Sequence, residues 1–290
     1  MKSRISVVIN TVNEERNLPS ALDSVFRWAA EIVIVDMYSD DRTVEIAQQY
    51  GAKVYLHPKV NFVEPARAFA IAKATSEWVL LLDADEMIPE RMSKILVQIA
   101  VNDSCDACTI PRLNYIFGSP VWHGGFGPHQ DPQMRFFKKD KVIPLSKIHH
   151  PISTIVGARI HAIAYRTDLA IIHFSYSDIA QVIEKFNRYT TVEAQQAFEY
   201  EKRATRFKAL LYVIWEFLSR FIWKKGYRDG WRGFYFAGFM SIYRWLTYSK
   251  LEELHSTGGK TKVVEMYSDV AIAISLSYEQ DVEATENYPL

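Results

Sequence analysis

Residues 78–86 read WVLLLDADE, which places three acids directly after a run of apolar side chains. The apolar run suits the interior of a folded domain, whereas Asp83, Asp85 and Glu86 do not. Either these acids lie at the edge of a sheet and face water, or they hold a positively charged group. The segments on either side decide between the two interpretations.

The chain around this stretch alternates between apolar β-rich runs and helix-like stretches. The β-rich runs are Ile5–Ile9, Ile32–Val35, Lys53–Leu56 and Trp78–Leu82. The helix-like stretches are residues 17–29, 42–50 and 64–75. Such alternation with continuous apolar strands predicts an α/β fold, in which helices cover both faces of a mostly parallel central sheet.

Polar clusters follow three of these strands. They are NTVNEE at residues 10–15, DMYSDD at 36–41 and DADE at 83–86. Carboxyl ends of parallel strands meet at one rim, where the ligand crevice of such sheets lies, so we expect the three loops to converge. Paired carboxylates there suit Mg²⁺ or Mn²⁺, which bridges acids and substrate phosphates. The first loop lacks the glycines of a dinucleotide-binding chain, which argues against an NAD or FAD enzyme.

Residues 104–175 change character. Short strand-like pieces at 107–113, 133–139 and 169–175 alternate with loops rich in Gly, Pro and His. They predict additional strands of mixed direction that carry a second half-site, followed by a helix at 177–200. The Gly-rich stretch HGGFGP at 123–128 is expected to shape an acceptor loop.

Three segments carry a resemblance to a known family. Residues 5–18 (ISVVINTVNEERNL), 32–47 (IVIVDMYSDDRTVEIA) and 64–86 (EPARAFAIAKATSEWVLLLDADE) resemble the nucleotide-sugar half of glycosyltransferase family 2. The similarity covers roughly the first 90 residues and extends more weakly to about residue 250. The chain most resembles the branch that contains lipopolysaccharide-core glucosyltransferases. This resemblance implies a GT-A fold, an inverting mechanism and a nucleoside-diphosphate sugar donor, with a UDP-linked hexose of the glucose type expected.

The resemblance also implies which residues bind the donor. Nucleotide contacts are carried over onto Thr11, Asn13, Glu14, Asp36, Ser39, Arg67 and Asp83. Asp83 and Asp85 match the D-x-D motif, whose Mn²⁺ or Mg²⁺ neutralises the diphosphate leaving group. DMYSDD replaces the smaller Gly-Ser-Thr turn of most members, so we expect Met37 and Tyr38 to reshape the base pocket.

The catalytic base has two candidates. An inverting transfer needs a group that takes a proton from the attacking hydroxyl. Related members carry a His-Glu pair downstream of an Arg-aromatic strand, and here Arg135 is followed by His149 and His150. His150 is one candidate base, and Asp131 is the other. An interpretation in which both residues only order a loop stays open.

Neither histidines nor cysteines predict a further metal site. The histidines considered are His123, His129, His149, His150, His161 and His173, and none has the spacing of a zinc motif. The chain has two cysteines, too few for a disulfide framework, and we interpret Cys105 and Cys108 as structural.

The region after residue 201 is basic and aromatic. It contains a helical apolar stripe formed by Leu210, Leu211, Ile214, Trp215, Leu218, Phe221 and Ile222. One interpretation is a pair of helices packed on the main domain or in a dimer interface. The other, which the resemblance favours, is an anchor at a membrane surface through residues 202–250, with basic side chains on anionic lipid and aromatic rings at headgroup depth.

These observations divide the chain into three parts. Residues 1–200 form the GT-A domain, with a nucleotide-sugar half at 1–100 and an acceptor half at 101–200. Residues 201–262 form the basic aromatic region, and 263–290 form an acidic tail that either folds back on it or stays loose. The formal net charge is zero, which gives no reason to expect a nucleic-acid partner.

The resulting hypothesis is an inverting, metal-dependent transfer of a hexose to a hydroxyl of a glycan or lipid-linked acceptor. We expect a cytoplasmic protein, peripheral on the inner face of the cell membrane, with a homodimer as an open alternative to a monomer. A nucleotidyltransferase is an alternative, although the loop NTVNEERN lacks the glycines and basic residues it would need. A membrane-associated nucleotide-sugar-binding protein with a degenerate acceptor site is another, because His150 departs from the family pattern.

Overall fold

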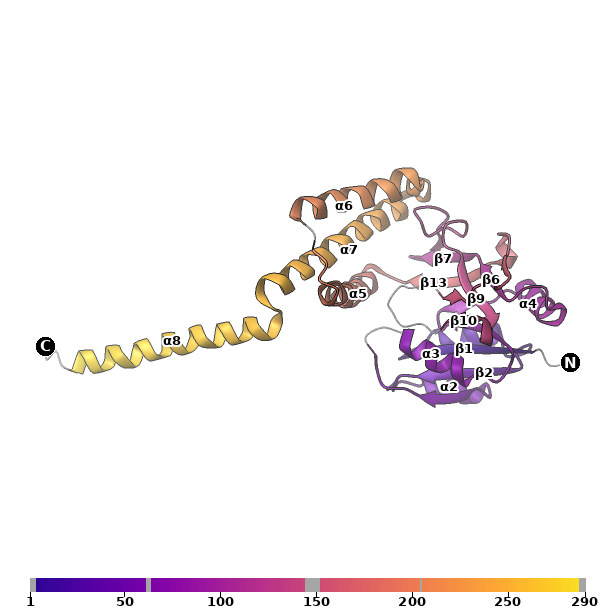
Figure 1. Cartoon of the computed structure of the whole chain (residues 1–290), viewed down its shortest axis with the longest axis horizontal. Helices are drawn as coiled ribbons and strands as arrows, with labels where there is room; N and C mark the ends of the chain where they lie inside the picture. Colours follow the sequence, from indigo (N-terminus) through magenta and orange to yellow (C-terminus); the bar gives the residue numbers. More distant parts are fainter. Residues whose placement is uncertain (1–3, 61–63, 144–151, 204, 287–290) are drawn as a thin grey trace.

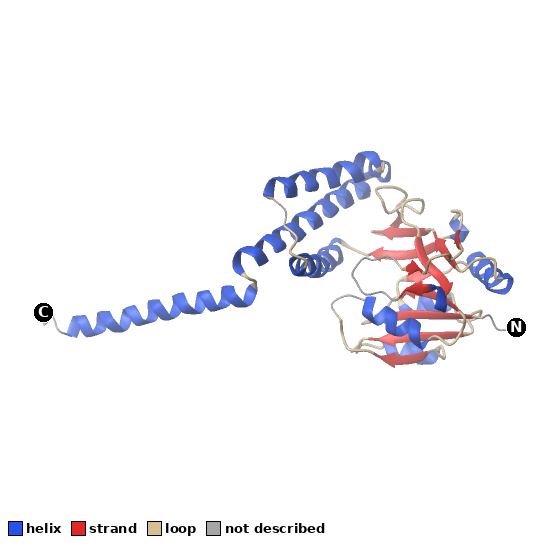
Figure 2. Cartoon of the chain, in the orientation of Figure 1, coloured by secondary structure: helices blue, strands red, loops and turns tan. Residues whose placement is uncertain are grey.

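The computed structural model describes residues 4–60, 64–143, 152–203 and 205–286, and it shows an α/β domain followed by a helical region (Figures 1 and 2). The central sheet has seven strands in the order β12-β6-β9-β4-β1-β2-β3. All its neighbouring pairs are parallel except those that β9 makes with β4 and β6. The predicted mostly parallel sheet is therefore confirmed.

The nucleotide-sugar half forms as the sequence predicts. Its strands are β1 (Ile5–Thr11), β2 (Glu31–Asp36), β3 (Lys53–Leu56) and β4 (Trp78–Asp83). Its helices are α1 (Leu18–Asp23), α2 (Thr43–Gln49) and α3 (Glu64–Lys73). The register aligns Thr11 with Asp36, and Asn10 with Asp83, so the three polar loops leave the sheet side by side.

The acceptor half adds α4 (Glu90–Asn102) and strands of both directions. The central sheet is extended by β6 (Ala107–Ile110), β9 (Gln133–Lys138) and β12 (Ile160–Ala162). A second sheet contains β5 (Glu86–Met87), β13 (Ile171–Tyr176), β7 (Arg112–Ile116) and β8 (Ser119–Pro120). The remaining elements are β10 (Val142–Ile143), β11 (Ser153–Thr154), η1 (Lys139–Lys141) and η2 (Thr167–Leu169). The expected strands of mixed direction are confirmed.

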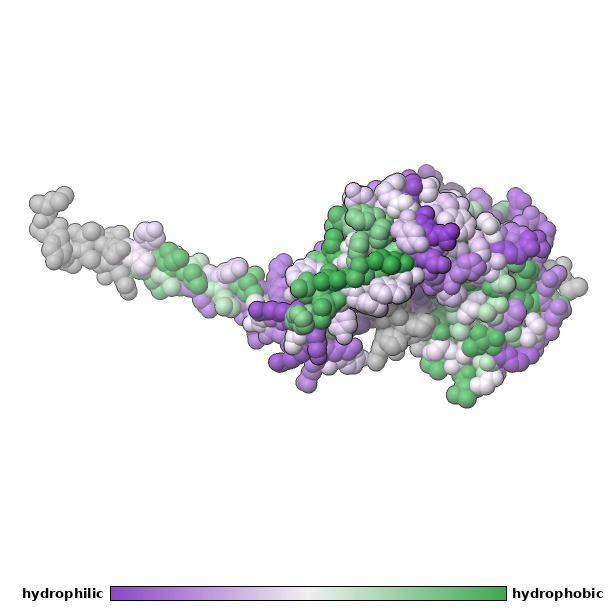
Figure 3. All heavy atoms as spheres, turned by 90° about the horizontal axis from the view of Figure 1, so that it is seen from above, coloured by the Kyte–Doolittle hydropathy of each residue, from purple (hydrophilic) through white to green (hydrophobic). Residues whose placement is uncertain are grey.

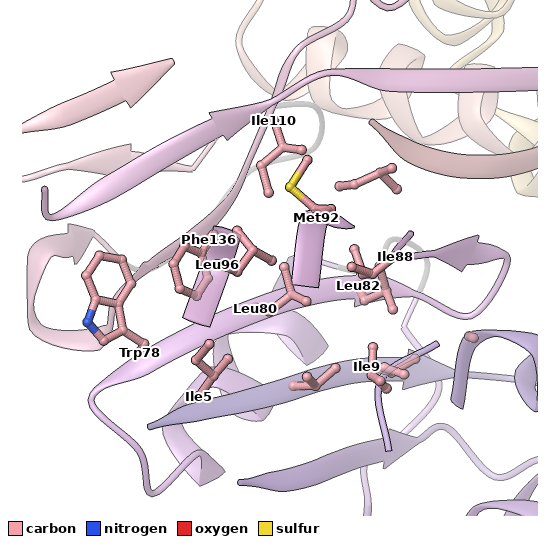
Figure 4. Close-up of a cluster of buried hydrophobic side chains, with 14 of the residues drawn as sticks. Ile5, Ile9, Trp78, Leu80, Leu82, Ile88, Met92, Leu96, Ile110 and Phe136 are labelled. Carbon is pink, nitrogen blue, oxygen red and sulfur yellow. The ribbon is translucent and has the colours of Figure 1, made fainter. Parts of the chain in front are cut away.

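The core lies on both faces of the central sheet, because alternate residues of its strands point to opposite sides. One cluster joins Ile9, Trp78 and Leu80 to Met92 and Leu96 of α4 (Figure 4). The other joins alternate strand residues such as Val8, Val33 and Leu81 to the buried alanines of α3. This double burial explains why the apolar run before Asp83 carries no polar side chain.

The helical region follows β13. Its elements are α5 (Ile179–Glu199), α6 (Arg206–Leu218), η3 (Ser219–Trp223), η4 (Gly226–Asp229), α7 (Gly230–Thr257) and α8 (Lys260–Glu286). Phe186 of α5 and both Phe236 and Tyr243 of α7 form a third buried cluster with Ile116 of β7. The helical region is thereby joined to the second sheet. No helix within the described residues is both long and apolar enough to cross a membrane.

The apolar stripe of α6 is partly exposed, since Leu210, Leu211, Ile214 and Trp215 are about half exposed. This is compatible with both interpretations of the region. One feature differs from the expectations. Residues 260–286 neither fold back on the basic region nor lack structure. They form α8, which points away from the rest of the molecule (Figure 1).

Glu31 joins the amino-terminal edge of the sheet, at the opposite end from the acidic loops. Its carboxylate accepts hydrogen bonds from Ser6 Oγ at 2.5 Å, Lys53 Nζ at 2.6 Å and the Thr75 amide at 2.6 Å. Burial raises the pKa of Glu31, but these donors outweigh burial and lower the pKa from its ordinary value of 4.5 to about 2. The ionised form therefore stabilises the fold, fully above pH 4.5 and less as the pH falls towards 2.

We expect Glu31→Gln to lower the free energy of unfolding at neutral pH by about 1–3 kcal/mol, the usual contribution of hydrogen bonds to a charged group. The difference from the wild type should narrow between pH 4.5 and 2, as Glu31 becomes protonated. Urea denaturation across this pH range measures it. Glu45→Gln, at an exposed pair with Arg42, is the matched control and should leave the free energy of unfolding nearly unchanged. A difference that stays constant with pH would contradict the assignment.

Candidate active site

The loops after β1 and β2 are held together by side-chain hydrogen bonds. Asp36 is fully buried, and its Oδ1 accepts from Thr11 Oγ1 at 2.9 Å and from Ser39 Oγ at 2.6 Å. The Asn13 amide donates to Ser39 Oγ at 2.8 Å, and Asn13 Oδ1 accepts from the Asp40 amide at 3.0 Å. The structure thus brings together four of the residues predicted to bind the nucleotide.

The loop after β2 carries a strained residue. Tyr38 has a φ of +56° and a side chain that is 54% exposed, so its ring stands at the rim. A Gly would adopt this backbone conformation without strain, whereas for a Tyr the same conformation is energetically unfavourable. Tyr38 therefore gives this loop a strained backbone and an exposed ring. That Met37 and Tyr38 reshape the nucleobase pocket stays a prediction.

Glu14 lies between these loops and the acidic stretch. Its backbone amide donates to Thr43 Oγ1 at 2.8 Å. Burial raises the pKa of its carboxyl, and the negative charges of Asp85 and Asp83 raise it further, against a hydrogen bond from Asn17. The loop after β1, which carries Glu14, and the D-x-D motif at residues 83–85 therefore share one electrostatic environment.

Asp83 is paired with two guanidinium groups. Its Oδ1 accepts from Arg67 of α3, and its Oδ2 accepts from Arg135 of β9 at 2.5 Å. Burial raises the pKa of Asp83, but the two arginines outweigh burial and hold the pKa well below its ordinary value. Predicted as both a nucleotide and a metal ligand, Asp83 here has each oxygen committed to an arginine.

Glu86 contacts both Asp83 and one of its two arginines, Arg135. Its side chain is fully buried, and its Oε2 accepts from the Asp83 amide at 3.0 Å. Its Oε1 lies 3.3 Å from both Arg112 Nη1 and Arg135 Nη2. The third acid of WVLLLDADE therefore faces neither solvent nor a helix terminus. It holds two arginines that approach from different strands.

Asp131, one of the two candidate bases, ends this chain of charges. Its Oδ2 accepts from Arg112 Nε at 3.0 Å and Nη2 at 2.6 Å, and from Asn114 Nδ2 at 3.2 Å. Its Oδ1 accepts from Gln133 Nε2 at 2.7 Å. The side chain is 18% exposed, so it is fixed in orientation but still reachable. The other candidate, His150, and its neighbour His149 lie outside the described residues.

His173 of β13 faces Asp85, the second acid of the D-x-D motif. Asn114 Nδ2 donates to Asp131 and to the Phe126 carbonyl at 2.6 Å, which leaves its Oδ1 to accept from His173 Nδ1 at 2.6 Å. His173 Nε2 is then directed at Asp85 Oδ2, 3.5 Å away. The tautomer of His173 is therefore set by the orientation of one amide.

The facing pair of Asp85 and His173 fits a divalent cation. A neutral His173 would point a lone pair at a carboxylate oxygen, so a proton or a metal ion must lie between the two atoms. Two protein ligands with phosphate oxygens of a substrate are a common set for Mg²⁺ or Mn²⁺. Among the described residues, no three His, Cys, Asp or Glu side chains gather closely enough to hold a metal ion by themselves.

Two further features face this site. Lys185 of α5 places Nζ 4.0 Å from Asp85 Oδ2, which adds a positive charge beside the acids. The side-chain amide of Asn10, at the rim end of β1, is buried without a hydrogen-bond partner among the described residues. Such an unpaired amide is costly unless a ligand or water satisfies it.

The Gly-rich acceptor loop is anchored on the helical region. The Gly124 amide donates to the Lys224 carbonyl at 2.8 Å, and the His123 amide donates to Asp229 Oδ2 at 2.8 Å. Gly127 is required there, because a Cβ would lie 1.9 Å from the Trp122 carbonyl oxygen. Asp131 follows directly, so its position depends on η3 and η4 as well as on the sheet.

The arrangement of these residues can be compared with known proteins. Residues 6–165 match the model of glycosyl transferase family 2. The chain belongs to this family. It is therefore a glycosyltransferase that uses a nucleotide-sugar donor, and its α/β fold is of the GT-A type.

Relatives align over nearly the whole chain. An uncharacterized glycosyltransferase of Rickettsia typhi is 27% identical over 87% of either chain. A lipopolysaccharide core biosynthesis glycosyltransferase of Rhizobium meliloti is 26% identical over 92% of this chain and 98% of its own length. Both alignments extend beyond residue 165, so they include part of the region after β13.

Solved structures align over less than half of their own length. TarS of S. aureus has a TM-score of 0.44 at 16% identity, covering 67% of this glycosyltransferase and 40% of TarS. Glucosyl-3-phosphoglycerate synthase from Mycobacterium tuberculosis, in complex with Mn²⁺ and UDP-glucose, has a TM-score of 0.32 at 22% identity, covering 39% and 44% of the two chains.

We expect Glu86→Gln to lower the free energy of unfolding by about 1–3 kcal/mol, because the amide turns a donor or a neutral oxygen towards Arg112 and Arg135. Urea denaturation at neutral pH measures this. The matched control is Glu90→Gln, at an exposed pair with Lys94 four residues along the chain, which should leave the free energy of unfolding nearly unchanged. Equal effects of the two substitutions would show that Glu86 does not hold the arginines.

Proposed function

We propose that this glycosyltransferase moves a hexose of the glucose type from a UDP-linked donor, with inversion, to a hydroxyl of a glycan or lipid-linked acceptor. The observation that carries the proposal is the Asn114 amide, which contacts both Asp131 and His173. Asn114 thereby links the candidate base Asp131 to His173, which faces Asp85, one of the acids that would lie beside a diphosphate. A base and a charged leaving group must lie on either side of the reacting carbon in such a transfer.

The donor would lie along the rim formed by β1, β2 and β4. Asp36 and Ser39 would face the nucleobase of the donor. Thr11 and Asn13 would shape the loop beside the nucleobase. Arg67 would reach the nucleotide from α3. Glu14 and Asp83 would border the ribose and the diphosphate. The unpaired amide of Asn10 supports a polar ligand at this place, because binding would satisfy it.

A divalent metal, Mn²⁺ or Mg²⁺, would be held by Asp85 and His173, and when bound it would neutralise the charge on the leaving diphosphate. Asp83 could join as a ligand only by releasing an arginine. Lys185 would add a fixed positive charge on the same side. Asp85 stays ionised to low pH, because His173 outweighs the effect of burial and lowers its pKa.

Asp131 is the base that the contacts favour. Arg112 and Asn114 occupy its Oδ2, whereas Oδ1 accepts from Gln133 Nε2 alone, so a remaining lone pair of Oδ1 would take the proton from the acceptor hydroxyl. The acceptor oxygen then bonds to the anomeric carbon, and the bond from that carbon to the diphosphate breaks with its electron pair leaving on the nucleotide. Arg112 keeps the carboxylate in place during this transfer.

The acceptor side is proposed to meet a membrane surface through residues 202–250, on the inner face of the cell membrane. Apolar side chains gather on the part of the helical region that faces the viewer in Figure 3, where α6, at the top of Figure 1, lies. Trp215, Ile222 and Trp223 are each more than half exposed. The exposed basic residues nearby are Lys202, Arg203, Arg206, Lys208, Lys224, Lys225 and Arg228. Basic and aromatic residues together are typical of helices that lie on anionic lipid.

We expect Asp131→Asn to lower kcat by about 10²–10⁴-fold, the usual contribution of a general base, while the affinity for UDP stays unchanged. A transfer assay with Mn²⁺ and isothermal titration with UDP give the two numbers. His150→Asn is the comparison. If His150→Asn abolishes turnover and Asp131→Asn does not, His150 is the base and the assignment to Asp131 is wrong.

We expect His173→Ala to weaken Mn²⁺ binding in the presence of UDP by at least tenfold, since losing even an outer partner of a metal ligand costs about 10–100-fold. Electron paramagnetic resonance of free Mn²⁺ measures this without turnover. His161→Ala, on exposed β12, should leave binding unchanged. Unaltered binding by His173→Ala would exclude His173 as a ligand.

We expect the double substitution Trp215→Ser with Trp223→Ser to reduce binding to vesicles that contain anionic lipid, because it removes two indole rings that would insert at headgroup depth. Co-sedimentation at low and moderate salt measures the bound fraction. Val101→Ser removes a similarly exposed apolar side chain from α4 and is the control. Vesicle binding that survives the tryptophan substitutions would place the membrane contact elsewhere.

A further inference from the structure

A cavity lies between α6 and α7, the two helices that run side by side in Figure 1. Its volume is about 550 Å³, within the range of pockets that hold a small molecule. On α7 it is lined by Trp245, Ser249, Glu252 and Ser256, which follow the i, i+4, i+7, i+11 spacing of one helix face. Ala209 of α6 lines it from the other side. Because the facing residues include an alanine and two serines, the helices pack without filling the space between them.

The buried part of the lining is apolar. Ala209 and Leu251 line the cavity and are only 7% and 5% exposed. The rings of Trp245 and Tyr248 also line it, and Tyr248 stacks on Tyr212 of α6 with ring centres 5.9 Å apart. A lining of this kind binds the aliphatic or aromatic part of a ligand.

The exposed part of the lining is charged. Arg206 Nη2 donates to Glu252 Oε1 at 3.0 Å, and these side chains are 89% and 44% exposed. Arg203 also lines the cavity and forms no ion pair with a described residue, so two guanidinium groups stand against one carboxylate. His255 adds an imidazole, whose Nε2 lies 3.0 Å from the Lys202 carbonyl oxygen. An excess of guanidinium groups favours an anion, and Arg suits phosphate in particular because it donates two parallel hydrogen bonds.

We propose that this cavity binds one amphiphile that carries a phosphate and an aliphatic chain, the chemistry of a membrane phospholipid. The phosphate would lie at Arg203 and Arg206, and the chain would cover Ala209, Leu251 and the ring of Trp245. A free phosphate would leave the apolar lining uncovered, and an uncharged aliphatic molecule would make no use of the arginines. The division of the lining into a buried apolar part and an exposed cationic part therefore matches both ends of such a molecule.

The cavity adjoins the exposed apolar face of α6. Tyr212, which stacks on Tyr248 of the cavity, also lines a groove with Leu211, Trp215 and Leu218. The inference deepens the proposed membrane contact and rests on it for the source of the ligand, because a lipid would enter from the surface on which α6 lies. A surface contact adsorbs to many lipids at once, whereas a cavity of this size holds a single molecule.

The first test compares ligands in isothermal titration of the full chain. Lysophosphatidic acid, kept below the concentration at which it forms micelles, should bind with one molecule per chain. Inorganic phosphate supplies the anion alone, and an uncharged polyoxyethylene detergent of the same chain length supplies the chain alone. Each should bind at least about tenfold more weakly than lysophosphatidic acid. If either binds as tightly, the cavity does not recognise both ends of an amphiphile and the proposal is wrong.

The second test fills the cavity. Ser249→Trp introduces a large ring from an exposed position of the lining, so it should raise the dissociation constant of lysophosphatidic acid by about tenfold or more. Leu210→Trp adds the same ring to α6 outside the lining, at a residue that is 46% exposed, and should leave the affinity unchanged. Thermal unfolding verifies that both variants keep the fold. Equal affinities of the two variants would overturn the assignment to this cavity.

The third test removes the charges. Arg203→Gln with Arg206→Gln should weaken lysophosphatidic acid by about tenfold or more and leave the uncharged detergent unaffected. Lys225→Gln with Arg228→Gln removes the same formal charge from exposed residues outside the lining and is the control. If both double substitutions weaken lysophosphatidic acid equally, general attraction rather than the two arginines holds the phosphate, and the proposal is wrong.

Co-sedimentation with anionic vesicles separates this inference from the membrane contact itself. Ser249→Trp should still bind vesicles, because Trp215 and Trp223 stay exposed. A wild type that binds vesicles but not monomeric lysophosphatidic acid would overturn the cavity site and leave the membrane contact standing. A wild type that binds the monomeric lipid but not vesicles would support the cavity site and show that the membrane contact is wrong.

Discussion

The ion network around the buried carboxylate of Glu86 is the constraint on which the site depends. Taking acids and arginines out of water is costly, and only mutual pairing with good geometry offsets that cost. Glu86 meets this requirement by holding Arg112 and Arg135 together while accepting the Asp83 amide. Each charge then restrains the next, so the polar groups are oriented before any substrate arrives.

The network also joins parts of the fold that have separate cores. Asp83 ends a strand of the central sheet, Arg135 comes from the antiparallel strand beside it, and Arg112 belongs to the second sheet. Arg112 donates to Asp131 and Arg135 donates to Asp83, and both arginines lie beside Glu86. One set of charges therefore holds Asp131 of the second half of the domain in a fixed relation to Asp83 of the central sheet.

The sequence predicts those features that depend on periodicity and on strand ends. Continuous apolar runs predict a doubly covered parallel sheet, and the position of Asp36 and Asp83 after such runs places both at one rim. The roles of Asn114 and His173 could not be predicted in this way. Neither belongs to a motif with a recognisable spacing, and only the pairing of β7 with β13 brings them together.

The Gly-rich loop at 123–128 joins the helical region to the segment that carries Asp131. Gly124 and His123 are hydrogen-bonded to the segment between α6 and α7, and Arg220 of that segment lies over the ring of Phe126, 4.8 Å from its centre. Asp131 follows in the same loop, where Arg112 and Asn114 of β7 hold its carboxylate. Contacts from the helical region and from the second sheet therefore position Asp131 together, so a helical region that sequence periodicity alone describes as a separate unit is structurally part of the candidate site.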